Sequence, residues 1–356
     1  MAEVSTKDRE EKEVRPPECD YLCVDDFLAT LVDARSLAAA LELGLIDTLA
    51  RGETLSAHEL RSRCSGDARG FRLLIDLLRQ NRVVEAGEAG IRITASFRSA
   101  LAYRDLLEAK LAFARLVLPD FVEAFPLLVR DPARFVRSAG LFHVFDYGRA
   151  VASTPENIAH TRQWVRITTA WTRYEVGVCL KRHDFTRHRR MLDVGGNSGE
   201  FVLRACRQHP ALQGTVIDLP AVCRIGRDHV RDEPEADRIT FQEADFRTDP
   251  LPGGFDLVSF KSALHDWPEA QARRLLTEAH AALTPGGTVL VFERAPMEGS
   301  PACRSFSALP FLLFSPWFRP PEVYADWLKE LSCREIDVQR FDLDTPFLLV
   351  RGRKAG

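Results

Sequence analysis

The sequence lacks the long apolar runs, the excess of positive charge and the leader segment that several classes of protein require. No window approaches the ~20 uninterrupted apolar residues of a membrane-spanning helix. The N-terminal segment MAEVSTKDREEKEVRPPE is highly charged and has no apolar core of a signal peptide. Lys and Arg number 48 against 51 Asp and Glu, which disfavours nucleic acid as the main partner. We therefore expect a cytoplasmic protein, with no membrane and no nucleic acid among its partners.

A metal-binding pattern is also missing. The eight cysteines are scattered along the chain, and only Cys19 and Cys23 have a spacing that suits a metal. No second Cys or His pair with such a spacing follows, so free thiols in a reducing compartment are favoured. No group of carboxylates or histidines is arranged to chelate a catechol, and we expect no metal.

The first part of the chain is expected to be mainly helical. The leucines of DDFLATLVDARSLAAALELGLIDTLARG recur at helical spacing, as do the apolar residues of GFRLLIDLLRQNRVV. Between these runs, Ser56 and Glu59 form a capping-box pattern. VVEAGEAGIRIT then predicts two short strands around a glycine-bearing turn. Helix, turn, helix and hairpin is the order of a winged helix.

A winged helix often binds DNA, but the charges of this one speak against it. The expected recognition helix carries Arg69, Arg72, Arg79 and Arg82, with Asp67 and Asp76 among them, so it presents no clean basic face. The apolar content fits a dimerisation domain better. A winged-helix regulator without catalysis remains a rival interpretation, which salt-dependent DNA binding would support.

From residue 190 the sequence alternates between short apolar strands and helices. MLDV, TVIDL, ITFQEAD, FDLVSFK and TVLVFERA read as strands, and helical patterns separate them. Such alternation predicts a mostly parallel, doubly wound sheet covered by helices on both faces. REIDVQRFDL and PFLLVRGRK follow as two strands with a short link. We expect an α/β, Rossmann-like domain with a terminal antiparallel hairpin.

The strands end in residues that suit a nucleoside. Asp193 closes the first strand, and the turn GGNSG that follows it can bring the backbone close to a ligand. Asp218, followed by Leu219, ends the second strand, where a carboxylate can accept both hydroxyls of a ribose. Asp245 ends the third and can accept an adenine amino group, while Phe246 can pack on the ring. The turn does not spell the dinucleotide fingerprint, so a dehydrogenase is a weaker interpretation.

Several segments resemble a known family. LDVGGNSGEF, IDLP, EADF, KSALHDW and LTPGGTVLVFER resemble the small-molecule O-methyltransferases that use S-adenosylmethionine, such as the plant phenylpropanoid and the bacterial polyketide and pigment enzymes. The resemblance extends from about residue 25 to the end of the chain. It implies a winged-helix-like N-terminal domain that forms a homodimer and a C-terminal domain that binds the cofactor.

The resemblance also implies roles for individual residues. Lys261 corresponds to a residue at the methionine end of the cofactor, and His265 to the general base that Glu293 orients. The remaining cofactor-binding positions that it implies are Gly195, Gly199, Asp218, Asp245, Phe246 and Trp267. Histidine suits a base because it titrates near neutrality and can contribute roughly 10²–10⁴-fold to a rate.

Two positions depart from the family pattern. Asn197 stands where the turn usually has its middle glycine, and asparagine tolerates a left-handed backbone. Phe318 stands where many relatives have a second catalytic glutamate, so His265 has one expected acidic partner instead of two. This leaves open an acceptor that is already nucleophilic, such as a thioether, an amine or an activated carbon, which His265 would only orient.

The acceptor pocket is expected to be apolar. The stretch ALPFLLFSPWF is too apolar for a solvent-exposed loop, although core packing also explains it. The candidate lining residues are Phe142, Trp164, Phe311, Phe314, Trp317 and Phe318.

The sequence thus predicts an O-methyltransferase for a small, largely apolar or aromatic acceptor, with His265 as base. Its 356 residues exceed one ordinary core. We divide them into a disordered tail (1–20), a winged-helix-like dimerisation domain (21–104), a helical linker contributing to the acceptor pocket (105–185) and the cofactor domain (186–356).

Overall fold

The computed structural model describes residues 15–52, 54–64, 67–297 and 306–356, without the side chains of residues 136, 141, 142 and 316. Its N-terminal part has the predicted order of helices followed by an antiparallel hairpin. The capping box forms as expected, because Glu59 accepts the backbone N–H of Ser56 at 2.9 Å and donates its own N–H to the Ser56 hydroxyl at 3.2 Å. The elements are η1 (Pro17–Phe27), α1 (Leu31–Glu42), α2 (Leu45–Ala50), α3 (Ala57–Cys64), α4 (Ala68–Gln80), β1 (Val84–Gly87), β2 (Gly90–Ile93), α5 (Ala95–Ala100) and η2 (Leu101–Tyr103).

The described residues include regular structure before the sequence boundary at residue 20. Residues 17–20 belong to η1, and Cys19 and Tyr21 are buried against the core of the neighbouring helices. Pro17 at the first helical position favours this start, because its fixed φ suits a helix. Residues 1–14 of the predicted tail lie outside the described residues.

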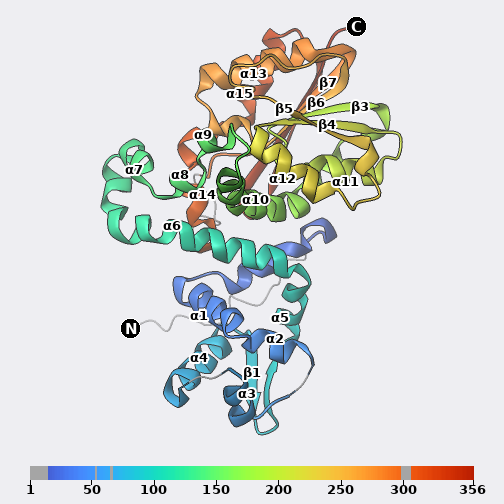
Figure 1. The fold of residues 1–356 in the computed structure, drawn as a ribbon. Helices are drawn as coiled ribbons and strands as arrows, with labels where there is room; N and C mark the ends of the chain where they lie inside the picture. Colours follow the sequence, from blue (N-terminus) through green and yellow to red (C-terminus); the bar gives the residue numbers. More distant parts are fainter. Residues whose placement is uncertain (1–14, 53, 65–66, 298–305) are drawn as a thin grey trace, which may run out of the picture.

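Two long helices connect the N-terminal helices to the sheet. In Figure 1, α6 crosses the molecule between α1–α5 and the sheet-bearing part, and α10 lies between α6 and the sheet. Thr154 caps α10 by accepting the backbone N–H of Asn157, and Pro155 occupies its first position. The elements of this region are α6 (Arg104–Arg130), α7 (Pro132–Ser138), α8 (Leu141–Val144), α9 (Tyr147–Ala150), α10 (Pro155–Arg182) and η3 (Phe185–Arg187).

The C-terminal half confirms the predicted Rossmann-like fold. Its seven strands have the order β5-β4-β3-β6-β7-β9-β8, and all neighbours are parallel except β9, which is antiparallel to β7 and β8. The chain proceeds from β3 outward to β5 and then returns to place β6 on the other side of β3. This reversal creates a crevice at the carboxyl ends of β3 and β6, which is where such sheets bind ligands. The strands are β3 (Arg190–Val194), β4 (Gln213–Asp218), β5 (Ile239–Glu243), β6 (Phe255–Lys261), β7 (Leu283–Arg294), β8 (Arg334–Asp342) and β9 (Pro346–Arg353).

Helices cover both faces of this sheet, as alternating patterns predict. No helix within the described ranges is long and apolar enough to cross a membrane. The helices are α11 (Glu200–Gln208), α12 (Pro220–Val230), η4 (Ala236–Arg238), η5 (Leu264–Asp266), α13 (Glu269–Ala282), η7 (Phe306–Ala308), α14 (Leu309–Leu312), η8 (Ser315–Trp317) and α15 (Pro321–Glu330).

A chain of buried ion pairs joins the two halves. Lys110 on α6 lies 2.8 Å from Asp25 of η1 and 3.2 Å from Asp344, which precedes β9. Arg294 at the end of β7 contacts Asp344 at 3.0 Å and Glu175 of α10 at 2.5 Å. Burying charge costs free energy unless each charge is paired, and here the signs alternate along the chain. These contacts fix α6 and α10 relative to the carboxyl edge of the sheet.

Candidate active site

A pocket of about 1030 Å³, part of it open to solvent, lies at the carboxyl edge of the sheet. Its floor is formed by residues at the ends of β3, β4, β5 and β6, and α10 and α14 contribute aromatic walls. The sequence-predicted residues that line it are Gly195, Asp218, Leu219, Asp245, Phe246, Lys261, His265, Trp267, Trp164, Phe311, Phe314 and Phe318. The topology therefore gathers most of the predicted residues around one cavity.

Four other predicted residues are not among the lining residues, and the side chain of a fifth, Phe142 on α8, lies outside the described residues. Asp193 is buried below the turn, where its Oδ1 accepts the Ser259 hydroxyl at 2.5 Å. Gly199 faces the ring of Phe241, and a Cβ there would lie 2.8 Å from that ring. The other two are Glu293, which lies behind His265, and Trp317, which packs against the main core.

The turn after β3 adopts the left-handed backbone that its sequence allows. Gly195, Asn197 and Gly199 have φ of +67°, +56° and +78°. A Cβ on Gly195 would lie 3.2 Å from that of Ala263 on the pocket wall, so a side chain would crowd the cavity. The turn thus exposes backbone to a ligand at this edge.

Asp218 is buried at the end of β4 and is held by two backbone donors. Its Oδ2 accepts the N–H of Asn197 at 2.8 Å, and its Oδ1 accepts the N–H of Leu219 at 2.7 Å. Burial raises the pKa of Asp218 to about 6, although both hydrogen bonds favour the ionised form. The carboxylate is therefore fixed in position with unused lone pairs beside the pocket.

The third acidic residue, Asp245, has a cationic partner that the sequence analysis did not predict. Arg247 donates to both of its oxygens at 2.6 Å and lies over the Trp267 ring, with 5.9 Å between guanidinium carbon and ring centroid. This pairing lowers the pKa of Asp245, so the carboxylate remains ionised. Phe246 and Trp267 pack edge to face, with centroids 5.9 Å apart. Two rings and a carboxylate thus lie together on the pocket lining.

The predicted base and its partner meet as the family resemblance implies. Nδ1 of His265 lies 2.5 Å from Oε2 of Glu293. Oε1 of Glu293 accepts the backbone N–H groups of Ala263 and Leu264 at 2.8 and 2.7 Å, which fixes this fully buried carboxylate. An ionised Glu293 assigns the proton to Nδ1 and leaves Nε2 as the proton acceptor.

A second carboxylate approaches the other side of the imidazole. Oδ1 of Asp266 lies 3.4 Å from Nε2 of His265, and its Oδ2 accepts the Tyr147 hydroxyl at 2.8 Å. The sequence analysis expected one acidic partner, and it missed Asp266 although this residue lies within the KSALHDW segment. Phe318 packs edge to face on His265, with centroids 5.2 Å apart. An apolar ring therefore lies beside the imidazole at the position where many relatives have the second glutamate.

The two carboxylates determine the basicity of His265. Burial alone would lower its pKa, but the charges of Glu293 and Asp266 outweigh this effect and raise the pKa above its ordinary value. Arg294 opposes the increase, and Tyr147 remains protonated because burial and Asp266 raise its pKa. His265 is therefore a stronger base than a free imidazole.

The methionine-end candidate, Lys261, takes part in the buried ion-pair chain. Its ammonium lies 2.5 Å from Glu175 and donates to the Thr172 hydroxyl at 3.1 Å. Arg294 shares Glu175 and lies 3.8 Å from the centroid of the Phe311 ring. Glu175 thus holds the cationic groups of Lys261 and Arg294 at the pocket wall. These three residues lie in separate segments of the sequence, so this ion-pair network was not predicted.

Aromatic side chains from the linker complete the pocket. Trp164 and Trp171 are two helical turns apart on α10 and both line the cavity, and Phe113 packs on Trp171 at 4.7 Å between centroids. Neither Trp171 nor Phe113 was among the pocket residues predicted from the sequence. The lining residues that were not predicted from the sequence are Phe113, Phe145, Tyr147, Thr168, Trp171, Thr172, Arg247, Ser262, Ala263, Asp266 and Arg294.

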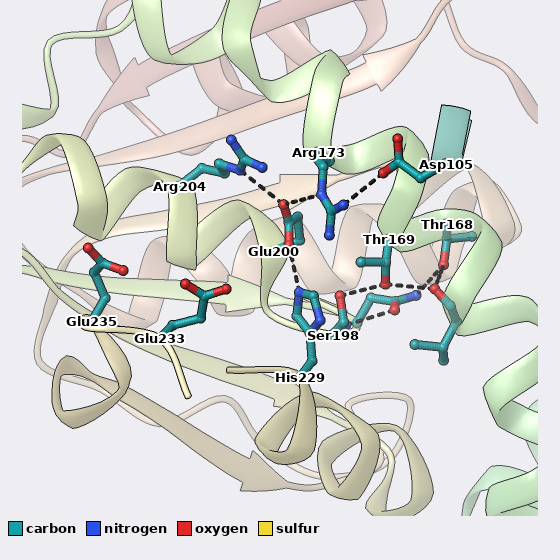
Figure 2. Close-up of polar contacts among 12 residues, drawn as sticks. Asp105, Thr168, Thr169, Arg173, Ser198, Glu200, Arg204, His229, Glu233 and Glu235 are labelled. Carbon is teal, nitrogen blue, oxygen red and sulfur yellow. Dashed lines mark hydrogen bonds and ion pairs between the residues drawn. The ribbon is translucent and has the colours of Figure 1, made fainter. Parts of the chain in front are cut away.

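Behind the turn, Glu200 is the centre of a second polar cluster (Figure 2). It is the first residue of α11 and accepts from Arg173 at 3.1 Å, Arg204 at 2.9 Å and His229 at 2.6 Å. Burial would raise its pKa, but these three partners lower it to about 2. The cluster ties α10, α11 and α12 together directly behind the turn.

These features together define the class of protein. A doubly wound sheet with a terminal antiparallel hairpin is the class I methyltransferase fold, and a fixed carboxylate after β4 next to a glycine turn fits an adenosyl group. The chain is an S-adenosylmethionine-dependent methyltransferase, with S-adenosylmethionine as its cofactor.

Comparisons with known proteins give the family. Residues 133–305 match the model of the O-methyltransferase domain. The 3-hydroxy-5-methyl-1-naphthoate 3-O-methyltransferase of Streptomyces sahachiroi is 30% identical over 93% of this chain and 94% of its own length. The N,N-dimethyltransferase OxyT of Streptomyces rimosus is 28% identical over 73% and 74%. The structure of the S-adenosylmethionine-dependent methyltransferase SibL in its apo form is 26% identical, with a TM-score of 0.62 over 91% of this chain and 96% of that one. The chain belongs to the S-adenosylmethionine-dependent small-molecule O-methyltransferase family.

Proposed function

We propose that the protein methylates a hydroxyl group of a small, flat and largely apolar aromatic acceptor. The observation that carries this proposal is the position of His265, which lies in an aromatic-walled pocket next to the turn and Asp218. Phe318 and Phe314 lie 5.2 and 6.3 Å from the imidazole, measured between ring centroids. Aromatic walls suit a flat ring, because stacked and edge-to-face contacts are both favourable. The relative named for a hydroxylated naphthoate supports the same acceptor class.

The residues around the turn are proposed to hold the cofactor. Asp218 accepts from the ribose, Asp245 and Phe246 contact the adenine with Trp267 beside them, and Lys261 lies at the methionine end. When bound, S-adenosylmethionine supplies an electrophilic methyl group on a sulfonium. Holding the acceptor in line with that group can itself supply ~7–11 kcal/mol of the barrier reduction.

His265 is proposed to take the proton of the acceptor hydroxyl at Nε2. Glu293 holds the proton on Nδ1 and stabilises the imidazolium that forms. The raised pKa of His265 brings it closer to the ~10 of a phenol, which makes the proton transfer more favourable. Asp266 lies on the Nε2 side of the imidazole, which faces the proposed acceptor, and it supplies there the negative charge that Phe318 cannot supply.

An acceptor panel with methyl-labelled cofactor tests this proposal. We expect label transfer to polycyclic phenols such as hydroxynaphthoates, and none to their O-methyl ethers, because only the free hydroxyl offers a proton to His265. The measurement is labelled product separated by chromatography, with the His265→Gln variant as the matched control.

The same panel distinguishes transfer to oxygen from transfer to nitrogen, sulfur or carbon. Transfer to aryl amines, thioethers or ring carbons alone would overturn the hydroxyl assignment while leaving methyl transfer in place. The amine alternative has one supporting observation, namely the similarity to an N,N-dimethyltransferase. Phe318 in place of a second carboxylate is compatible with an acceptor that needs less base assistance.

We also propose that the protein forms a homodimer through its N-terminal helices. An apolar groove of about 1210 Å³ lies between α1 and α4, and Val32 and Leu73 at its edge are 55% and 61% exposed. Exposed apolar area of this kind marks interaction surfaces in folded proteins. A second copy is the occupant to which the family resemblance points.

A Val32→Glu/Leu73→Glu double variant is expected to sediment as a monomer where the wild type sediments as a dimer. Two buried, unpaired carboxylates would oppose closure of the interface. Val151→Glu, at a 45% exposed residue after α9, is the control that keeps the wild-type mass. A dimeric double variant with an intact circular dichroism spectrum would place the interface elsewhere.

A further inference from the structure

Helix α10 contacts the turn after β3 through two side chains and the first residue of α11 through a third. Thr168 accepts a side-chain N–H of Asn197 at 3.0 Å. Thr169 lies 2.7 Å from the Ser198 hydroxyl, and Arg173 contacts Glu200 (Figure 2). The same helix carries Trp164, Trp171 and Thr172 on the pocket wall. One helix therefore touches both the turn proposed to hold the cofactor and the pocket proposed for the acceptor.

Asn197 is the residue that connects these two parts. Its backbone N–H donates to Asp218 at 2.8 Å, and its side-chain Nδ2 donates to the Thr168 hydroxyl at 3.0 Å. Its Oδ1 accepts the backbone N–H of Ser198 at 2.7 Å, so both ends of the amide are used. Many relatives have glycine here, as the family resemblance implies, and a glycine offers no side chain to α10.

The Thr168 hydroxyl oxygen can accept the hydrogen bond from Asn197. Its hydroxyl proton points into its own helix, with the Trp164 and Val165 carbonyls each 3.1 Å away. A lone pair of the same oxygen therefore remains for Asn197. Thr168 and Asn197 both line the pocket, in a partly buried setting where a hydrogen bond competes less with water.

We propose that Asn197 and Thr168 form a positioning pair, in which the side-chain bond between the turn and α10 sets the Asp218 carboxylate and so raises cofactor affinity. Removing the bond frees the turn to shift, and the Asp218 carboxylate then loses its fixed N–H donor. The proposal rests on the cofactor site described under Proposed function, but it needs no knowledge of the acceptor.

A double-mutant cycle measured by calorimetric titration with S-adenosylhomocysteine tests the pair. Asn197→Gly keeps the left-handed backbone without strain, since glycine adopts positive φ freely. Thr168→Val keeps the shape of the side chain and removes its oxygen. Each single variant is expected to raise the Kd about threefold to tenfold, the usual net worth of one hydrogen bond. The double variant is expected to bind no more weakly than either single variant.

Two further variants separate positioning from general damage. Thr168→Ser restores the hydroxyl and is expected to bind like the wild type. Thr277→Val on α13 removes a hydroxyl with the same bond to its own helix, at 2.9 Å from the Arg273 carbonyl, and is expected to leave the Kd unchanged.

The proposal is overturned by single-variant Kd values within twofold of the wild type, or by losses that multiply in the double variant. Failure of the cofactor site itself looks different, because the wild type would then not bind S-adenosylhomocysteine. A lowered Tm with an unchanged Kd would show that the bond stabilises the fold without positioning the turn, and this too overturns the proposal.

Discussion

A His265→Gln variant is expected to lose roughly 10²–10⁴-fold in kcat while it binds S-adenosylhomocysteine with wild-type affinity. Glutamine can still accept a hydrogen bond from an acceptor hydroxyl, but it cannot take the proton. The residue is 7% exposed and lies on η5, whereas the carboxylate that we assign to the cofactor belongs to Asp218 on β4, so affinity and rate should separate. Rate is measured with the acceptor that the panel identifies, and affinity by calorimetry.

The control is His280→Gln on α13, which should leave both quantities unchanged. If His265→Gln kept more than about a tenth of the wild-type kcat, the base assignment would be wrong and the histidine would only orient the acceptor. Methyl transfer itself would survive that result.

The pH dependence of the same reaction provides an independent check of the base. The base must be neutral to act, and the pKa of His265 is raised above 6.5 by Glu293 and Asp266. The rate of the wild type should therefore fall as the pH decreases through a value above 6.5. Glu293→Gln removes one charge, so the acidic limb of its profile should move to lower pH. Its kcat should also fall, because the amide no longer fixes the proton on Nδ1.

The strand-end residues could be predicted because topology alone brings them together. In a parallel sheet the carboxyl ends of all strands lie at one edge, so Asp218, Asp245 and Lys261 meet whatever the details of packing. Local pattern also determined the glycine turn and the capping box of Ser56 and Glu59.

The residues that the sequence analysis missed depend on long-range packing. Tyr147 reaches Asp266 across 119 positions of the chain, and Arg294 reaches Glu175 across an equal separation. No periodicity relates such pairs, because the placement of α9 and α10 over the sheet follows from core packing. Asp193 shows what position alone leaves open, since its strand-end position suggests a ligand contact while its Oδ1 accepts the Ser259 hydroxyl within the sheet.

The second acidic partner of His265 is its neighbour in the chain, Asp266, and not a residue at the position of Phe318. In the family pattern, a second acidic partner is expected at the position of Phe318, where this chain has no glutamate. The structure places Asp266 at 3.4 Å from Nε2 instead, held by the Tyr147 hydroxyl. Negative charge beside the imidazole is thus supplied by the next residue in the chain. The sequence alone did not show that the Asp266 side chain turns toward His265, because that depends on the contact with Tyr147.

An Asp218→Ala variant is expected to weaken S-adenosylhomocysteine binding by about 10²-fold or more. Hydrogen bonds to a charged group contribute about 1.5–3 kcal/mol each, and a ribose offers two hydroxyl donors to this carboxylate. The substitution also removes the acceptor for the N–H groups of Asn197 and Leu219, which leaves the turn without its anchor. Calorimetric titration measures the loss, and Asp237→Ala at an exposed position of η4 is the control.

The protonation of Asp218 gives this prediction a second, mutation-free form. Burial raises the pKa of Asp218 to about 6, and the ionised carboxylate is the better acceptor of hydrogen bonds from the ribose hydroxyls. Ligand binding therefore favours the ionised form, so the affinity of the wild type for S-adenosylhomocysteine should decrease as the pH falls below about 6 and level off above it. The Asp218→Ala variant has no such group and should lose most of this pH dependence. A wild-type Kd that stays constant between about pH 5 and 8, together with tight binding by Asp218→Ala, would remove the ribose role from this carboxylate.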